Sequence, residues 1–309
     1  MTALKERRKA VKGLGFFIDA LKPIILVILM LILLYNLDTV KRDVYNGIKW
    51  IISCLIPTLF PFAILTHLLT GTSLRLPMSR VLSKILGVRD ELLVPLVLGI
   101  ICGFPIGAML TREIYINGAI KKEEAERVII LSSQPSLAYL IGIGTMGLSG
   151  SKKACSLVMA SLITVVLLLL LTRRKYSNSS HSSVISRQSL PLAKCITLSG
   201  EAMINLSFFI TAFYAIASVI KLTIKRPAFV SLILPFLELS NAINYACSLD
   251  PSLSFKAFII PFSLGFSGLS VYLQIKSILR DTDLTIRKYI PIKLVEGIVM
   301  AIFTIILEA

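Results

Sequence analysis

Glu238 is an ionisable residue inside an apolar stretch, the run LILPFLELSNAIN, three residues after Pro235. A charge at membrane depth is costly and tends to face a cavity or a partner, so it predicts a functional site. We expect Glu238 to bind a coupling ion, H⁺ or Na⁺, with Lys276 as a candidate partner. Ser240 and Asn241 beside it are candidate solute-binding residues. The alternative is that Glu238 lies at the external rim of a shallow hairpin.

Hydrogen-bonding residues interrupt two other apolar runs, VIILSSQPSLAYLIG and LGFSGLSVYLQIK. Pro135 in the first run removes a backbone donor, and lipid cannot satisfy the polar groups around it. We therefore predict two unwound helix segments that line a cavity. Serines bonded back to their own helix would also explain the first run, and close helix packing the second. The candidate solute-binding residues of these runs are Ser132, Ser133, Gln134, Ser136, Ser267, Gly268, Ser270 and Gln274.

A further run, LGIICGFPIGA, carries Gly103, Pro105 and Gly107 at its middle. Glycine and proline permit a turn at membrane depth where protein or a water-filled cavity satisfies the freed backbone groups. We predict a re-entrant hairpin over residues 92–111, with these three residues at the solute site. The alternative is an ordinary kinked span.

The composition indicates that helices in a membrane position these residues. Of the 309 residues 55% are hydrophobic and 16% charged, with a mean hydropathy of +0.83. A soluble domain of this length cannot bury so much apolar surface. Apolar runs near the ~20 residues needed to cross a bilayer recur along the chain. We predict an all-α polytopic membrane protein, surrounded by the lipid bilayer of a bacterial plasma membrane.

The charged and metal-ligating residues exclude several other classes of protein. The net charge is +16, but Lys and Arg lie in the connections between apolar runs, as in membrane proteins. No basic stretch is interleaved with aromatic residues, which argues against nucleic acid as a partner. The five cysteines and two histidines lack ligand spacing, so no metal and no cofactor is predicted. Without HExxH, GxSxG or Walker A motifs, we assign no catalytic residue and expect no enzyme.

Charge also predicts how the chain threads through the membrane. Basic residues before the apolar run 23–37 indicate an uncleaved first span that starts in the cytoplasm. The stretch 173–195 has five basic residues and no acid, which indicates a cytoplasmic linker. We expect the connections that follow residues 70 and 279 to lie on the cytoplasmic side of the membrane. Residues 149–154 and the C-terminus are expected on the external side. A basic external loop at 221–226 violates the positive-inside rule.

The chain then divides into two similar halves around the linker. The expected apolar elements are 47–70, 92–111, 128–148 and 155–172 in the first half, and 198–220, 228–247, 257–279 and 289–307 in the second. Each half reads as span, re-entrant hairpin, interrupted helix and span, and the second half runs in the opposite sense. Such inverted repeats are typical of secondary transporters, whose solute site lies near the midplane. The predicted segments are the N-terminus with an extra first span (1–44), the first repeat (45–172), the linker (173–195) and the second inverted repeat (196–309).

Other polar residues are expected to have structural roles. Glu201 and Glu296 lie near span ends, and we interpret them as interfacial. We expect His67 to be a packed ring. Residues 80–91 alternate basic and apolar side chains, which predicts a short helix on the cytoplasmic surface. Residues 117–128 indicate the start of a helix with acids in its first turn.

Several motifs in the same order resemble one known family. They are IPTLFPF, GFPIGA followed by REIYINGAI and EEAER, SSQPS, LELSNAI and GFSGLSVYLQ. Over roughly residues 45–280 the chain resembles the YlbJ (SpoVV) family of sporulation integral membrane proteins, within the wider nucleoside-recognition or Gate-domain group. The resemblance implies a transporter of dipicolinate that acts in the mother-cell-derived outer forespore membrane. SSQPS stands where an asparagine-containing stretch is expected, which leaves the ligand open.

The residues and the resemblance together predict a transporter of a small polar or anionic solute that works by alternating access between two repeats. A homo-oligomer is also considered. The alternatives are a non-transporting morphogenetic or scaffold protein of sporulation, and a transporter of nucleoside-type solutes.

Overall fold

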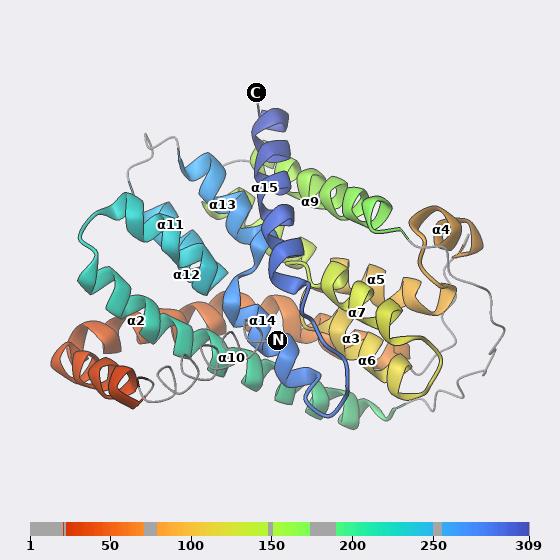
Figure 1. Ribbon diagram of the computed structural model, residues 1–309, viewed down its shortest axis with the longest axis horizontal. Coiled ribbons are helices and arrows are strands. Elements are labelled where there is room, and N and C mark those ends of the chain that lie inside the picture. Colours follow the sequence, from red (N-terminus) through yellow and green to blue (C-terminus); the bar gives the residue numbers. More distant parts are fainter. Residues whose placement is uncertain are drawn as a thin grey trace, which may run out of the picture.

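The computed structural model describes residue 21 and residues 23–70, 79–147, 151–173, 190–249 and 255–308, and this part of the chain is all-helical without strands (Figure 1). Six of its helical stretches are long and apolar enough to cross a membrane: Leu37–Leu68, Lys122–Thr145, Lys152–Leu171, Leu192–Thr223, Lys256–Ile278 and Tyr289–Glu308. The prediction of an all-α integral membrane protein is confirmed.

The N-terminal region differs in detail from the expected elements. The helix Pro23–Tyr35 is apolar but shorter than the six long stretches. After a turn at Asn36, α2 (Leu37–Trp50) continues through the π-helical turn η1 (Ile51–Leu55) into α3 (Ile56–Thr70). The predicted element 47–70 therefore starts ten residues too late. One charged residue of α2, Asp43, has partners on α10, whereas Asp38, Lys41, Arg42 and Lys49 are exposed.

The two halves contain the same order of elements. The first has α4 (Ser79–Leu86), α5 (Asp90–Cys102), α6 (Ile106–Ile116), α7 (Lys122–Ser132), α8 (Leu137–Gly142), the π-helical turn η2 (Ile143–Gly147) and α9 (Ser151–Leu171) after α3. The second has α10 (Leu192–Thr223), α11 (Pro227–Leu237), α12 (Leu239–Ser248), α13 (Lys256–Phe266), α14 (Gly268–Ile278) and α15 (Tyr289–Glu308). Interrupted helices thus lie where the sequence predicts them. The short helix predicted over residues 80–91 is present as α4, which ends at Leu86, and residues 90 and 91 belong to α5.

The expected hairpins are present as pairs of packed helices. A Cβ placed on Gly99 of α5 would lie 3.0 Å from the Cα of Gly107 in α6, so α6 folds back on α5. In the second half, Val230 of α11 and Ala242 of α12 belong to one buried cluster. Whether the pairs are re-entrant in a bilayer, and whether the halves are inverted repeats, stay predictions.

Connections predicted to be cytoplasmic gather at one end of the molecule. Arg173 Nη2 donates 2.7 Å to the Lys84 carbonyl, joining the end of α9 to α4. Lys122 Nζ lies 3.1 Å from Asp283 Oδ2, which joins the start of α7 to the connection before α15. Hydrogen bonds from Tyr115 and Lys122 lower the pKa of the Asp283 carboxyl. This shared end agrees with the predicted topology.

Connections predicted to be external make different contacts. Asp43 Oδ2 on α2 accepts a 2.6 Å hydrogen bond from Ser218 of α10 and lies 3.4 Å from Lys221 Nζ. Glu308, at the end of α15, accepts a 3.0 Å hydrogen bond from Ser156 near the start of α9. The basic loop at 221–226 is thus partly neutralised by Asp43, which reduces the cost of its predicted external position.

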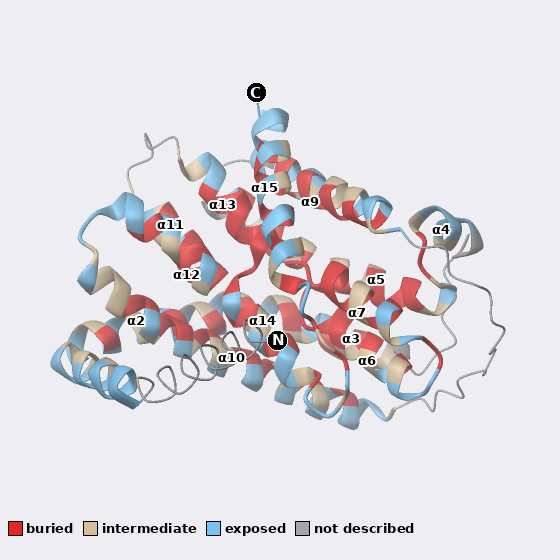
Figure 2. Ribbon diagram, in the orientation of Figure 1, coloured by how far each residue is buried: buried red, intermediate tan, exposed pale blue. Residues whose placement is uncertain are grey.

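Burial follows the expected distribution for a membrane protein. Buried residues concentrate where α5, α7, α12, α13 and α15 meet, and exposed residues lie on the outer faces of α2, α10 and α15 (Figure 2). Large apolar side chains on those outer faces include Phe208, 70% exposed, and Ile306, 62% exposed. A bilayer would cover such surfaces.

Candidate functional site

The first helix interruption separates α7 from α8 at residues 133–136. Pro135 has no N–H to donate to the Leu131 carbonyl one turn earlier. The Gln134 side chain replaces it, because its Nε2 donates a 3.1 Å hydrogen bond to that carbonyl. The Ser136 hydroxyl then caps α8 by accepting from the Tyr139 N–H at 3.1 Å. Local side chains therefore satisfy the backbone that the proline opens.

The turn of the α5–α6 hairpin packs against this interruption. Gly103 has φ +85, and a Cβ there would meet the Ser136 backbone nitrogen at 2.8 Å. The Phe104 N–H donates a 2.8 Å hydrogen bond to the Gln134 carbonyl. Gly107 lies equally close to Ser132, whose Oγ would be 2.3 Å from an added Cβ. Glycine is required at these contacts because any side chain would separate the two segments.

The second half repeats this arrangement with different residues. The α13–α14 interruption falls at Ser267, which has φ 68, and Gly268, which has φ 81. A Cβ on Gly268 would lie 2.9 Å from the Leu237 carbonyl oxygen, at the turn between α11 and α12. In both halves a hairpin turn thus contacts an interrupted helix.

Glu238 lies at the second hairpin turn and is only 2% exposed. Its Oε1 accepts from the Ser240 N–H at 3.0 Å and from the Ser240 hydroxyl at 2.8 Å, and its Oε2 accepts from the Asn241 N–H at 2.6 Å. The carboxylate therefore caps the N-terminus of α12. Lys276 is exposed, and among the described residues no ion pair joins it to Glu238. The suggested Lys276 partner is thus wrong, because α14 directs that side chain outward.

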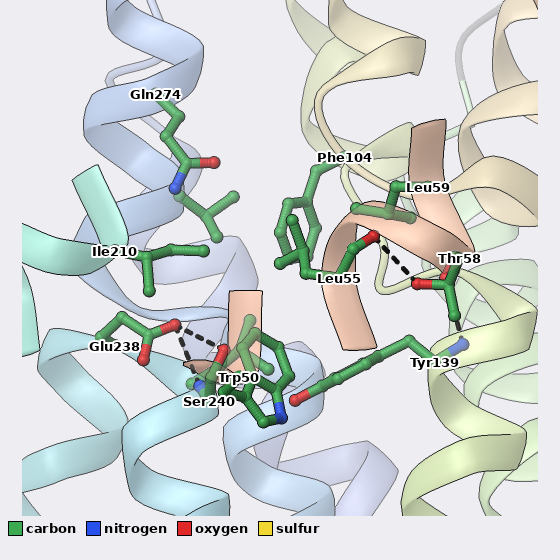
Figure 3. Close-up of a pocket in the computed structure, with 13 residues that line it drawn as sticks. Trp50, Leu55, Thr58, Leu59, Phe104, Tyr139, Ile210, Glu238, Ser240 and Gln274 are labelled. Atoms are coloured by element: carbon green, nitrogen blue, oxygen red, sulfur yellow. Dashed lines mark hydrogen bonds between the residues drawn. The ribbon is translucent and has the colours of Figure 1, made fainter. Parts of the chain in front are cut away.

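A pocket lies where the two halves meet (Figure 3). Its empty volume is about 410 Å³, including the opening to solvent. The first half and α10 contribute Trp50, Leu55, Thr58, Leu59, Phe104, Ser136, Tyr139 and Ile210, and the second hairpin and α14 contribute Glu238, Leu239, Ser240, Val271 and Gln274. Trp50 and Tyr139 meet edge to face, with centroids 5.6 Å apart. Both halves therefore enclose a largely apolar pocket with a few polar groups, as is usual for small-molecule sites.

Two polar atoms in the lining make no hydrogen bond of good geometry in the described protein, although the Ser240 side chain lies beside the first of them. They are the Tyr139 hydroxyl and Gln274 Oε1. Figure 3 shows the Tyr139 hydroxyl directed towards Trp50 and the Gln274 side-chain oxygen pointing towards Phe104. Gln274 Nε2 is engaged with the Ser270 hydroxyl at 3.1 Å. Unpaired buried polar groups are costly, so the pocket offers one hydroxyl and one amide oxygen to a bound molecule.

The candidate solute residues fall into three groups. Those that line the pocket are Ser136, Ser240 and Gln274, together with the ion-coupling candidate Glu238. The others lie behind the lining and position it: Gly103, Gly107, Ser132, Ser133, Gln134, Asn241, Ser267, Gly268 and Ser270. Pro105 borders a smaller pocket beside the half-buried His67. Binding by any of these residues stays a prediction.

Sequence reasoning missed the aromatic and α2–α3 contributions to the pocket. Trp50, Thr58 and Tyr139 lie on faces that sequence alone does not distinguish from lipid-facing ones. The π-helical turn η1 is the one local signal, since such turns often occur at functional sites, but it is visible only in the structure.

The prediction for Glu296 was wrong, because its side chain is 1% exposed inside the protein and not interfacial. It lies 2.9 Å from Nζ of Lys293, which is itself fully buried. Both belong to the stripe of α15 that faces the protein. Glu201, by contrast, is exposed on α10. Among the described residues no group of three or more His, Cys, Asp or Glu could hold a metal.

The fold and the pocket define an integral membrane protein with two helical halves that meet at a central cavity. The chain is 24% identical over 301 residues to "Sporulation integral membrane protein YlbJ" of Bacillus subtilis (strain 168), covering 81% of this chain and 73% of that protein. The similarity confirms the resemblance to the YlbJ family of sporulation integral membrane proteins. No family model matches the chain. No solved structure matches it either.

Proposed function

We propose that this protein transports a small polar or anionic solute across the membrane, with dipicolinate in spore maturation as the solute. The pocket between the two halves is the site, and access alternates between the membrane faces as the halves move. The protein is proposed to be a transporter and not an enzyme, located in the outer forespore membrane.

The observation that carries this proposal is the pair of unpartnered polar atoms in the pocket. A scaffold protein would gain stability by pairing or removing the Tyr139 hydroxyl and Gln274 Oε1, because buried polar atoms without partners are destabilising. A solute that hydrogen-bonds to both atoms would supply the partners that they lack. Phe104 and Trp50 provide faces against which a planar ring could pack.

The order of elements supports transport as well. Each half places a hairpin turn against an interrupted helix, and the pocket lies between the two contacts. Broken helices that meet near the centre of a membrane protein are typical of secondary transporters. Irregular backbone is tolerated there because protein or a water-filled cavity satisfies it.

Uptake of labelled dipicolinate into proteoliposomes tests the proposal. We expect uptake by the wild-type protein and at least tenfold weaker apparent affinity in Tyr139→Phe. Because the hydroxyl makes no hydrogen bond of good geometry, and the Ser240 hydroxyl beside it already donates to Glu238, its removal should lower thermal stability in detergent very little. Tyr45→Phe is the matched control, since Tyr45 is exposed on α2 and is not one of the residues that line the pocket.

The alternatives give different results in the same assay. Uptake of a labelled nucleoside in place of dipicolinate would favour the nucleoside-type solute. Absence of uptake and of binding for both compounds would favour the scaffold role. Equal affinity in Tyr139→Phe and wild type would remove this hydroxyl from the site.

A further inference from the structure

Lys293 and Glu296 form an ion pair in the interior of a membrane protein. Their side chains are 0% and 1% exposed, and Nζ lies 2.9 Å from Oε1 one turn along α15. Burial of two charges is costly even when they are paired, so such a pair in a membrane helix points to a function. The pair is absent from the lining of the central pocket and has no role in the site described so far.

The Lys293 ammonium also binds the interrupted helix of the first half. Its Nζ donates to the Ser133 carbonyl, inside the α7–α8 interruption. One residue after Glu296, Gly297 packs against α13 of the second half, where a Cβ on Gly265 would lie 2.8 Å from its Cα. Through α15 the ion pair therefore contacts the interrupted helices of both halves.

One oxygen of the pair is not satisfied. Glu296 Oε2 is buried and makes no hydrogen bond of good geometry among the described residues, and the Gln134 side chain lies beside this carboxyl group. An ionised carboxylate needs donors on both oxygens, and Lys293 supplies one only to Oε1. A metal ion is a poor occupant, because the ammonium already holds the cation position beside the carboxylate and the described residues offer no metal-binding cluster. Oε2 is therefore the oxygen of the pair that is free to take up a proton.

The neighbouring helices bring no further charge to the pair. The charged residue of α13 is Lys256, at its first position, which donates to the Leu249 carbonyl. The lysines of α9, residues 152 and 153, are exposed at its start. The charged residues of α7 occupy its first two turns, where they bond the connections at 86–89 and 285. Tyr289, whose hydroxyl lacks a partner, is the other titratable group on this face of α15.

We propose that the Lys293–Glu296 pair is the proton-binding site that couples solute movement to proton movement, an inference that rests on the proposed transport function. A proton from the acidic side forms an O–H bond at Glu296 Oε2, and the charge of the pair changes from zero to +1. Lys293 keeps its hydrogen bond to the Ser133 carbonyl. Ser136, which lines the pocket, lies three residues after Ser133. An anionic solute bound at Ser136 balances the new positive charge of the pair, so proton and anion bind and leave together.

Glu296→Gln separates binding from coupling, because glutamine has the shape of the protonated acid and cannot release a proton. In proteoliposomes, we expect the wild type to accumulate labelled dipicolinate when the outside is made acidic, and to exchange it at equal pH. In Glu296→Gln the acid-driven accumulation should be at least tenfold lower than in the wild type, and exchange should be retained. Glu201→Gln, at an exposed position of α10, is the control and should retain both.

Three results would overturn the proposal. Acid-driven accumulation at the wild-type level in folded Glu296→Gln excludes the pair as the coupling site. A flat pH response in Glu238→Gln, with a normal response in Glu296→Gln, assigns coupling to Glu238 instead. If Glu296→Gln does not fold, the test is calorimetry of dipicolinate binding to the wild-type protein in two buffers of different ionisation enthalpy. We expect the protein to take up one proton for each solute bound. Binding without proton uptake would contradict the role of the pair.

Failure of the proposed transport function is distinguishable from failure of the proposed proton site. In that case wild type shows neither accumulation nor exchange and does not bind dipicolinate. Proton uptake by purified wild type after a step to acidic pH, followed with a pH-sensitive dye, then tests the pair directly. Uptake larger by one proton than in Glu296→Gln supports the proton site, and equal uptake contradicts it.

Discussion

The backbone N–H of Phe104 donates a 2.8 Å hydrogen bond to the carbonyl of Gln134. This bond joins the turn of the α5–α6 hairpin to the interruption between α7 and α8. Since Phe104 also lines the pocket and Gln134 satisfies the carbonyl opposite Pro135, a movement of the hairpin would change both the backbone and the cavity. The same contact explains why so many polar candidates lie behind the lining and not in it.

Gly107→Ala tests the close packing of the first hairpin. The added Cβ would lie 2.3 Å from Ser132 Oγ and 2.5 Å from Ser132 Cβ, so α6 and α7 must separate. Overpacking of this kind costs about 1–3 kcal/mol. We expect a lower midpoint of thermal unfolding in detergent and reduced dipicolinate uptake.

Gly200→Ala is the matched control for this substitution. Gly200 lies within α10, and no heavy atom outside its own helix backbone lies within 4 Å of an added Cβ. Alanine in a helix is favoured over glycine by about 1 kcal/mol, so Gly200→Ala should be neutral or stabilising. Ser132→Gly should partly restore stability to Gly107→Ala. Equal effects at the two glycines would show that the hairpin contact is not tight.

Gln134→Leu tests whether the side chain replaces the donor that Pro135 lacks. Loss of the 3.1 Å bond leaves the Leu131 carbonyl unsatisfied, at a cost of about 1–3 kcal/mol. We expect a corresponding decrease in stability towards denaturant. Adding Pro135→Ala supplies a backbone N–H and should recover part of the stability while transport stays low, because a continuous helix no longer fits the hairpin turn. No recovery in the double variant would contradict the proposed replacement.

Glu238→Gln tests the capping role of this carboxylate. Glutamine puts an NH₂ group in place of one oxygen, so the N–H groups of Ser240 and Asn241 no longer each face an acceptor oxygen of their own. We expect a loss of about 1 kcal/mol in unfolding free energy, the typical value of an N-cap. Thermal unfolding of Glu238→Gln beside Glu201→Gln measures it. A variant as stable as wild type would mean that the carboxylate is retained for another reason, such as ion coupling.

Cysteine labelling tests the predicted sidedness of the two ends. In a background without native cysteines, we expect cysteines at positions 84 and 283 to react from the cytoplasmic side, because their connections contact one another through α4, α9 and α7. A cysteine at position 221 should react from the external side. Labelling of 84 and 283 from opposite sides would contradict the arrangement of the connections.

The sequence by itself determined the helical class and the location of every interruption in the two halves. These features follow from local chemistry. Apolar runs require hydrogen bonds within the chain in lipid, and Pro135, Gly103 and Gly268 favour a break in the helix at their positions. Proline alone does not fix a break, since Pro95 and Pro261 lie inside α5 and α13. The family resemblance likewise depends on short motifs in order, which need no knowledge of contacts.

Only the tertiary structure decided which polar groups share a site. Glu296 reads as a span-end charge in sequence, but the packing of α15 against α13 and α7 buries it together with Lys293. Trp50 and Tyr139 look like ordinary apolar residues of their spans until the helices place them around one cavity. Such pairings depend on which helix faces meet, a property of packing between segments far apart in the chain, and hydropathy along a single helix does not contain it.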